Sequence, residues 1–500
     1  MKMNYLKKPS IYTFPLVSSN NSAQCDCGFD QIEYSRSKNL IIQKNCYYKA
    51  MYLNKLLINS QKKIINLDNE HFILYNSYYQ SIMVNKSVLL FLSLLNPALK
   101  TNPENLINII VNEWGKQLFY STVDKLIKIK AIEIKGDKQS DQNRINQTLS
   151  VWLHITDRCN LNCSYCYVSQ NNNVISLDTG KKAIKSILDS ALKYNYSKVR
   201  IKYAGGEPSY YLNIITKLHQ HAKKLFTKHN IYLEGVVLTN GTLWNINMID
   251  TLKKNDLKII ISLDGINNFH NVHRKYKNGS GSYINVNKTI NLLLKNDIKP
   301  NISITITNEN VDGLPELLNY LLNEKLYFSL NIYRNILPPK CKISCDEKKI
   351  ISGMLNSYEV IKSNLPNFSL LSSLLDNINI SRPHLHSCGV GHSYIVFDTQ
   401  GYISECQMNM KHKISKISDI DPISILRNNS NNIQNISIDE KEECSDCIYR
   451  YWCTGGCPLQ TYIASGCFHK KSPNCNIYKA LIPEVLKLEG LRMLLYNKSE

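Results

Sequence analysis

The alternation of strand-like and helix-like segments between residues 149 and 333 most constrains the fold of this chain. Six short apolar stretches have the character of strands, and helical segments such as Thr179–Leu192 and Val311–Leu322 lie between them. The expected strands are 149–156, 198–204, 231–238, 258–263, 301–306 and 327–333. Strands that alternate with helices over short links form parallel sheets with right-handed crossovers. We therefore expect an α/β fold, an open, TIM-like partial (β/α)6 barrel, with functional residues at the carboxyl ends of the strands.

Three cysteines follow the first of these strands within one short loop. Cys159, Cys163 and Cys166 have the spacing C-x3-C-x2-C. A cubic iron–sulfur cluster normally takes four thiolates, so three ligands from one loop leave the fourth iron open to a small molecule. Closely spaced cysteines also bind zinc, and a zinc knuckle or a set of buried thiols is the alternative interpretation.

Turns that contain glycine end the next three strands. They are Ala204-Gly205-Gly206-Glu207-Pro208, Leu238-Thr239-Asn240-Gly241-Thr242 and Ser262-Leu263-Asp264-Gly265. Adjacent glycines let a ligand approach the backbone where side chains would clash. Together with the cysteine triplet, these segments resemble the motifs of radical S-adenosylmethionine (SAM) enzymes.

The resemblance implies a set of ligands and contacts. In that family the open iron of a 4Fe–4S cluster binds SAM, and reductive cleavage of SAM gives a 5′-deoxyadenosyl radical. By resemblance, the cluster ligands are Cys159, Cys163 and Cys166, and the SAM contacts are Tyr165, Gly205, Gly206, Glu207, Pro208, Asn240, Ser262 and Asp264. His270 and Arg274 match a further motif of one branch of the family. We expect a structural role for His270, and we expect Arg274 to bind a carboxylate of SAM or of the substrate in catalysis.

A second constellation of cysteines occupies the carboxyl-terminal third of the chain. Its spacing is C-x12-G-x4-C, gap, C-x2-C-x5-C-x3-C, gap, C, and its cysteines are Cys388, Cys406, Cys444, Cys447, Cys453, Cys457 and Cys475. The pattern resembles the seven-cysteine SPASM domain, which accompanies radical SAM maturases of peptides and proteins and holds two auxiliary 4Fe–4S clusters. A zinc ribbon built from the four cysteines between 444 and 457 is the alternative.

The SPASM resemblance divides these cysteines between two clusters. It assigns Cys388, Cys406 and Cys457 to the first auxiliary cluster, and Cys444, Cys447, Cys453 and Cys475 to the second. One position of the first cluster then has no cysteine, because segment 382–386, which precedes Cys388, contains none. That iron is either open to a substrate thiolate or bound by His384, His386 or a distant cysteine such as Cys345. Six further cysteines have no assigned role: Cys25, Cys27, Cys46, Cys341, Cys345 and Cys467.

Length, cysteine content and net charge limit where the protein is expected to be located and which partners it is expected to bind. A chain of 500 residues with 16 cysteines is too long for a small disulfide-stapled domain, and it shows neither a signal peptide nor an apolar run long enough to cross a bilayer. We therefore expect a cytoplasmic protein whose thiols are metal ligands. The formal net charge of +20 suggests a nucleic-acid partner. A general bias towards Asn, Ile and Lys and the negative charge of cluster-bound thiolates argue against one.

The remaining segments suggest further domains. Between residues 66 and 135, an alternating hairpin, three helical stretches and a short strand resemble the winged-helix leader-binding element of enzymes that modify ribosomal peptides. A plain packing domain is the alternative. The predicted divisions are an unassigned segment 1–65, a winged-helix-like module 66–135, a linker 136–148, a radical SAM barrel 149–335, a bridging region 336–380, a SPASM domain 381–485 and a tail 486–500.

These resemblances predict a peptide-modifying radical SAM oxidoreductase. The expected reaction crosslinks a ribosomal precursor peptide that carries a leader, through a thioether between a cysteine sulfur and a carbon; a carbon–carbon crosslink is also open. The expected electron donor is of the flavodoxin or ferredoxin type. An anaerobic sulfatase maturase, which makes formylglycine, is an alternative, but such enzymes carry an Asp base where this chain has Gln407. A zinc-stabilised basic binding module is an alternative of a different class.

Overall fold

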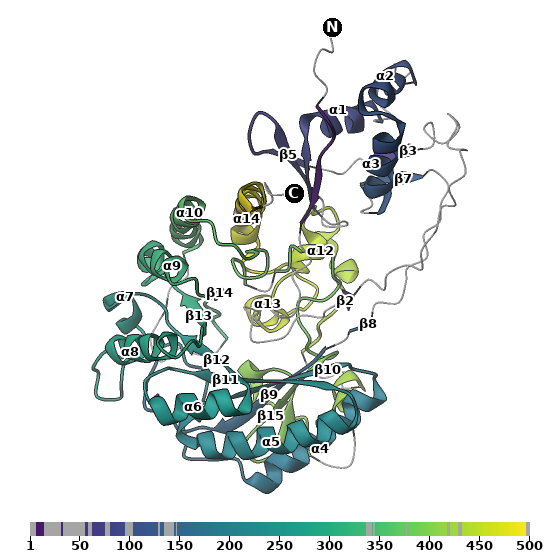
Figure 1. Cartoon of the computed structure of the whole chain (residues 1–500). Helices are drawn as coiled ribbons and strands as arrows, with labels where there is room; N and C mark the ends of the chain where they lie inside the picture. Colours follow the sequence, from purple (N-terminus) through teal and green to yellow (C-terminus); the bar gives the residue numbers. More distant parts are fainter. Residues whose placement is uncertain are drawn as a thin grey trace.

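The computed structural model of the protein has an amino-terminal module, a central α/β domain and a cysteine-rich carboxyl-terminal region (Figure 1). The structure describes residues 7–14, 32–33, 56–58, 63–75, 81–95, 104–128, 131–134, 145–146, 148–336, 343, 346–376, 378–381, 383–417, 421–428 and 433–496. In this part of the chain, no helix combines the length and the apolar character that a membrane span requires.

Six parallel strands form the centre of the α/β domain. They are β9 (Thr148–Thr156), β10 (Lys198–Gly205), β11 (Tyr232–Thr239), β12 (Leu257–Ser262), β13 (Asn301–Ile306) and β14 (Phe328–Ile332). Neighbours in the chain are neighbours in the sheet, and β14 lies at one edge of it, so the barrel is open. The predicted α/β partial barrel is confirmed, and each predicted strand lies within one residue of the observed one.

Helices cover the outer face of this sheet (Figure 1). They are α4 (Leu177–Lys193), α5 (Leu212–Lys228), α6 (Ile246–Asn255), α7 (Asn268–Asn271), α8 (Tyr283–Leu294) and α9 (Leu314–Asn323), with the short 3-10 turns η2 (Pro208–Tyr211) and η3 (Val311–Gly313). Polar caps start two of them: the Ser176 side chain accepts from the backbone N–H of Thr179, and Asn245 accepts from that of Met248. Alternate residues of β9 such as Leu153 join the core beneath the helices, whereas Trp152 faces the other side of the sheet.

Three strands of the cysteine-rich region extend the same sheet. Strand β15 (Tyr394–Phe397) pairs in parallel with β9, and β16 (Tyr402–Ser404) and β17 (Ser415–Lys416) follow in antiparallel order. The result is one nine-stranded sheet. The cysteine-rich region is therefore built onto the barrel through backbone hydrogen bonds.

The rest of the cysteine-rich region is made of short helices and one long one. They are η4 (Gln407–Asn409), α11 (Pro422–Asn428), η5 (Ile438–Glu440), η6 (Glu442–Cys444), α12 (Arg450–Cys453), α13 (Pro458–Ser465) and α14 (Cys475–Tyr496), and α10 (Glu347–Ser363) of the bridging region packs against α14. The prediction that the chain forms a tail from residue 486 is wrong for the residues up to Tyr496. They continue α14, and Leu486, Leu488 and Met493 are buried.

The amino-terminal module has its own core. Its strands are β1 (Ile11–Thr13), β3 (Leu56–Ile58), β4 (Lys63–Asn66), β5 (His71–Tyr75), β6 (Ile82–Asn85) and β7 (Ile132–Ile134), and its helices are α1 (Lys86–Leu94), α2 (Glu104–Trp114) and α3 (Lys116–Lys128). The pair formed by β2 (Ile32–Glu33) and β8 (Ile145–Asn146) lies apart from this module, near β10 (Figure 1). The predicted hairpin is β5–β6, within a sheet of order β1-β6-β5-β4. Phe91 packs against Trp114 and Phe119 at ring-centroid distances of 5.9 and 5.4 Å.

The amino-terminal module contacts the cysteine-rich region. Tyr75 of β5 stacks on Tyr449 and on Trp452, with ring centroids 6.2 and 6.3 Å apart. Five cysteines, Cys25, Cys27, Cys46, Cys341 and Cys345, and most of the predicted linker lie outside the described residues.

Candidate active site

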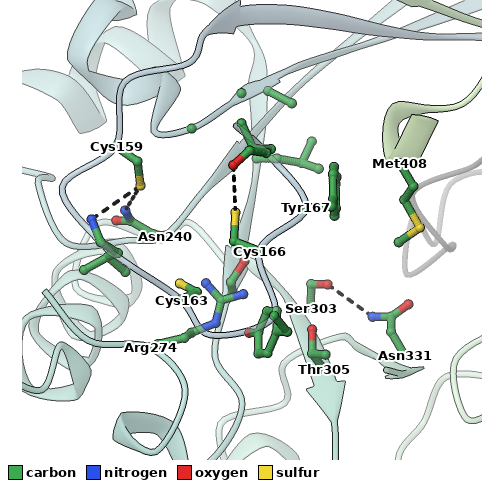
Figure 2. A pocket seen from close by; sticks show the side chains of 18 of the residues that line it. Cys159, Cys163, Cys166, Tyr167, Asn240, Arg274, Ser303, Thr305, Asn331 and Met408 are labelled. Atoms are coloured by element: carbon green, nitrogen blue, oxygen red, sulfur yellow. Dashed lines mark hydrogen bonds between the residues drawn. The ribbon is translucent and has the colours of Figure 1, made fainter. Parts of the chain in front are cut away.

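An open cavity of about 1460 Å³, a volume that includes the solvent at its mouth, lies at the carboxyl ends of the parallel strands (Figure 2). The loop after β9 and the ends of the five following strands all contribute to its wall. Its lining includes Cys159, Cys163, Tyr165, Cys166, Gly205, Gly206, Asn240, Ser262, Thr305, Arg274 and Asn331, and Met408 comes from the cysteine-rich region. The structure thus brings together most of the residues that the sequence motifs selected.

The three cysteines of the first motif lie together at one end of this cavity, opposite Asn331 and Met408 (Figure 2). All three are unpaired thiols. Burial raises the pKa of Cys159 to about 11 and that of Cys163 to about 12, so both thiols are neutral unless a metal binds them. The Asn240 amide nitrogen lies 3.7 Å from the Cys159 sulfur.

This donor set fits an iron–sulfur cluster. Three thiols from one loop face one large cavity, as a cluster with one open corner requires. Within the described residues, no three His, Cys, Asp or Glu side chains meet around a single metal ion.

Gly205, the last residue of β10, and Gly206 hold the cysteine loop close to this strand. Gly206 donates its N–H to the Thr156 carbonyl at 2.7 Å, and Glu207 donates to the Arg158 carbonyl at 2.8 Å. A Cβ on Gly205 would lie 2.3 Å from the Thr156 oxygen, and one on Gly206 would lie 2.4 Å from the Arg158 oxygen. The glycines are therefore required by the approach of the protein backbone itself, besides lining the cavity.

Glu207 and Pro208 lie behind the cavity wall. The Glu207 carboxylate is fully buried and accepts from the Ser209 N–H, the Thr239 hydroxyl and the Asn240 N–H at 3.0, 2.6 and 2.6 Å. Burial raises its pKa, although these donors oppose the shift. In this structure Glu207 positions the Asn240 segment, and a contact of Glu207 or Pro208 with SAM stays a prediction.

The buried Asp264 and the half-buried Arg274 and Tyr165 form a cluster beside Cys163. Asp264 accepts from the Thr305 N–H and from the Arg274 Nε, both at 2.8 Å, and also from the Tyr165 hydroxyl. Burial would raise the pKa of Asp264, but the Arg274 guanidinium prevails and the pKa is lowered. Asp264 lies outside the cavity lining, whereas Arg274, Tyr165 and Ser262 line it.

His270 has the environment of a structural residue. It is fully buried, its Nε2 lies 2.9 Å from the Ser282 hydroxyl, and its Nδ1 accepts from the Asp264 N–H at 3.3 Å. Burial lowers its pKa to about 3, so the ring is neutral near pH 7.

Several lining residues were missed by the sequence motifs. Thr305 and Asn331 lie near the carboxyl ends of β13 and β14, so the strand-end rule alone selects them. Arg334 also lines the cavity and forms a two-bond pair with Asp376, with both distances 2.5 Å. Met408 has no local sequence signal, because only the return of the chain through β15 brings it to the barrel.

The second cysteine constellation separates into the two predicted groups. Cys388, Cys406 and Cys457 are buried in one cluster of side chains with Trp152 and Ala204. The other four, Cys444, Cys447, Cys453 and Cys475, line a separate small pocket. Their roles as cluster ligands stay a prediction.

The candidates for the unfilled position of the first group have defined surroundings. His384 is buried. The His386 ring lies tilted against that of His392, with ring centroids 4.1 Å apart, and its Nδ1 contacts the Asn435 carbonyl at 2.8 Å. Cys345 lies outside the described residues, and Cys467 is half-buried.

Comparison with protein families and curated proteins places the barrel among known enzymes. Residues 153–321 match the model of the Radical SAM superfamily. An uncharacterized protein of Methanocaldococcus jannaschii is 33% identical over 190 residues, which are 38% of this chain and 63% of that protein, so the match spans less than two thirds of it. The cysteine-type anaerobic sulfatase-maturating enzyme of Clostridium perfringens is 24% identical over 324 residues, 60% of this chain and 85% of that enzyme.

Two further comparisons concern a bacteriocin pathway and the fold. The antilisterial bacteriocin subtilosin biosynthesis protein AlbA of Bacillus subtilis is 28% identical over 177 residues, 35% of this chain and 36% of AlbA. Native anSMEcpe with bound AdoMet and the Cp18Cys peptide has the same fold, with a TM-score of 0.58 and 20% identity over 69% of this chain and 99% of that one.

Proposed function

We propose that this protein crosslinks a ribosomally made precursor peptide through a thioether, because residues 153–321 match the model of the radical SAM superfamily, whose members are enzymes that use SAM and a 4Fe–4S cluster. The bond would join a cysteine sulfur of the peptide to one of its carbon atoms. The matches to a sulfatase-maturating enzyme and to a bacteriocin biosynthesis protein support a peptide or protein as the substrate.

The position of the first group of carboxyl-terminal cysteines carries this proposal. Cys388, Cys406 and Cys457 pack against Trp152 and Ala204, and these two residues also line the barrel cavity. A peptide in the cavity would therefore lie between Cys159, Cys163 and Cys166 on one side and the second set of thiols on the other. Such an arrangement suits a reaction that starts with hydrogen abstraction and ends with the removal of an electron.

The chain's own residues hold and shape the site. Cys159, Cys163 and Cys166 would hold the cluster, which together with SAM would supply the radical chemistry for hydrogen abstraction from the peptide. Asn240 donates towards the Cys159 sulfur and so favours its thiolate form. The Arg274 guanidinium, held in place by its ion pair with Asp264, is a positive charge beside Cys163 and next to the cavity. Trp152 and Met408 supply apolar surface that excludes water from the reacting atoms.

The cavity favours thioether formation over formylglycine formation. None of the described side chains that line it is an Asp, Glu or His, the usual general bases. Gln407 has the place of the sulfatase maturases' Asp, and its side-chain oxygen accepts from the Tyr394 hydroxyl at 2.8 Å. A thiol that binds a metal loses its proton without such a base. Sulfatase maturation remains the second candidate, because the match to the Clostridium perfringens enzyme covers 85% of its length.

Two further parts of the proposal concern partners. The amino-terminal module, with its β5–β6 hairpin and helices α1 to α3, would bind the leader of the precursor. A flavodoxin or ferredoxin would supply the electron that starts the reaction.

The test uses anaerobically reconstituted full-length protein with SAM and dithionite. One substrate is a short cysteine-containing peptide encoded beside this gene, and the other is a sulfatase-derived cysteine peptide. We expect about twelve irons per chain, 5′-deoxyadenosine, and a precursor that loses a pair of hydrogen atoms and one alkylatable thiol. The matched control is the Cys159→Ala/Cys163→Ala/Cys166→Ala variant, which should make no 5′-deoxyadenosine.

The outcomes separate the two candidates. An aldehyde on the sulfatase peptide, detected with a hydrazine probe, would establish the formylglycine reaction instead. A precursor of unchanged mass, while SAM is still cleaved, would refute the crosslinking proposal. Equal 5′-deoxyadenosine from the triple variant would refute the assignment of the cluster site.

A further inference from the structure

A buried lysine lies among the cysteines of the carboxyl-terminal region. Lys441 is 3% exposed and directly precedes η6, and its carbonyl accepts from the Cys444 N–H at 2.9 Å. A lysine side chain is rarely buried unless its charge is compensated.

The side chain of Lys441 reaches two other segments of the same region. Its Nζ donates to the Lys470 carbonyl at 3.3 Å, between Cys467 and Cys475. It also crosses Gly455, between Cys453 and Cys457, so closely that a Cβ on Gly455 would lie 2.7 Å from the Nζ. The ammonium group therefore lies where the segments that carry both predicted cluster groups meet.

The groups able to compensate this charge are the thiols. Within the described part of the chain, Lys441 forms no ion pair with an Asp or Glu. Burial lowers the pKa of Lys441, and Cys444, Cys453, Cys457 and Cys467 act in the opposite direction. Of these, Cys444 and Cys453 belong to one predicted cluster and Cys457 to the other.

Thioether formation requires a place for one electron. The carbon gives a hydrogen atom to the deoxyadenosyl radical, and the thiol gives a proton to solvent as the carbon–sulfur bond forms. One electron is left over and must reduce an auxiliary cluster. The reduction potential of a thiolate-ligated cluster depends on its net charge and on hydrogen bonds near its sulfurs, and a fixed cation favours the reduced state.

We propose that Lys441 is a positioning residue whose ammonium group serves both auxiliary clusters as a fixed cation and raises their reduction potentials. This inference rests on the proposed function, because it requires the clusters to be present. In this proposal Lys441 acts on the clusters through its charge.

The test measures reduction potentials in a background with only the auxiliary clusters. In the Cys159→Ala/Cys163→Ala/Cys166→Ala protein, Lys441→Met and Lys441→Gln remove the charge and Lys441→Arg keeps it. The matched control is Lys470→Met, which removes an exposed ammonium group but retains the backbone carbonyl that Lys441 contacts. Each reconstituted protein is titrated with redox mediators and followed by electron paramagnetic resonance.

We expect the neutral variants to lower the ratio of reduced to oxidised auxiliary cluster at least tenfold at a fixed potential, or about 59 mV for a one-electron couple. The Lys441→Arg and Lys470→Met variants should have the same auxiliary-cluster reduction potentials as the parent protein. Equal potentials in all five proteins would overturn the proposal while leaving the proposed function intact.

Iron analysis separates the remaining outcomes. About eight irons per chain in the triple-alanine parent supports two auxiliary clusters, and a parent without iron would overturn both this inference and the cluster assignment. If the neutral variants fail to assemble clusters while Lys441→Arg succeeds, the charge is needed already at assembly, which supports the proposal. Failure of Lys441→Arg as well would overturn it, because the shape of lysine would then matter rather than its charge.

Discussion

At the scale of single residues, Gly205 and Gly206 at the end of β10 set the position of the cysteine loop. The motif predicted their place beside the cavity, since glycine-rich turns after parallel strands commonly approach ligands. It did not predict that the Thr156–Arg158 backbone would occupy the space of their side chains. Contacts between backbones distant in the sequence leave no local pattern, so only the structure shows this second constraint.

Gly206→Ala should therefore disturb the first cluster site. The new Cβ would lie 2.4 Å from the Arg158 carbonyl oxygen, which cannot rotate away. We expect the free energy of unfolding to fall by about 1–3 kcal/mol. Iron content should drop by about four atoms per chain. Urea denaturation and iron analysis check these two results.

Gly279→Ala is the matched control for this substitution. Gly279 has a φ of +85° and no atom within 4 Å of an added Cβ. Alanine there incurs only the strain of the left-handed backbone, about 1 kcal/mol, and should keep the full iron content. A Gly206→Ala protein with normal iron and stability would show that the cysteine loop tolerates displacement.

At the scale of elements, the parallel strands of the barrel were easier to predict than strand β15 and the end of helix α14. Buried parallel strands are continuous apolar runs between turns, and this pattern identified β9 to β14. Strand β15 has only four residues, and its partner β9 lies far away in the sequence. Nothing local distinguishes it from an apolar stretch of loop. The end of α14 was missed for a similar reason, because its burial depends on α10 and on the amino-terminal hairpin.

Two leucines of α14 test whether its last turns are structural. Leu486 is completely buried and Leu495 is 53% exposed, and both belong to the segment predicted as a tail. Leu486→Ala should lower the free energy of unfolding by about 2–5 kcal/mol. Leu495→Ala should change it by less than about 0.5 kcal/mol. Equal, small effects in urea denaturation would mean that this segment does not support the core.

At the scale of the whole molecule, buried neutral histidines predict how stability depends on pH. Burial lowers the pKa of His219 to about 4 and that of His270 to about 3, whereas the unfolded chain has the ordinary value of 6.5. Below that value the unfolded chain binds more protons than the folded one. Stability should therefore fall as the pH decreases from 6.5 towards 4.

His219→Gln should weaken this dependence. The histidine is 3% exposed and its Nδ1 lies 3.1 Å from the Tyr203 hydroxyl. Between about pH 6.5 and 4.5, the variant should lose less stability than the parent by on the order of 2 kcal/mol. The exposed His229, replaced in the same way, is the control and should leave the slope unchanged. Parallel curves for the parent and His219→Gln in urea denaturation would contradict the assignment.

The pairing of β15 with β9 limits how this protein can be divided. In the chain, β9 begins the barrel and β15 comes after its last strand, yet the two share a hydrogen-bonded edge. A fragment cut after β14 would present that edge to solvent, and bare apolar strands recruit other chains into aggregates. An exchange of the barrel, β9 to β14, between relatives would therefore have to include β15 to β17. The barrel and the cysteine-rich region would then evolve as one unit.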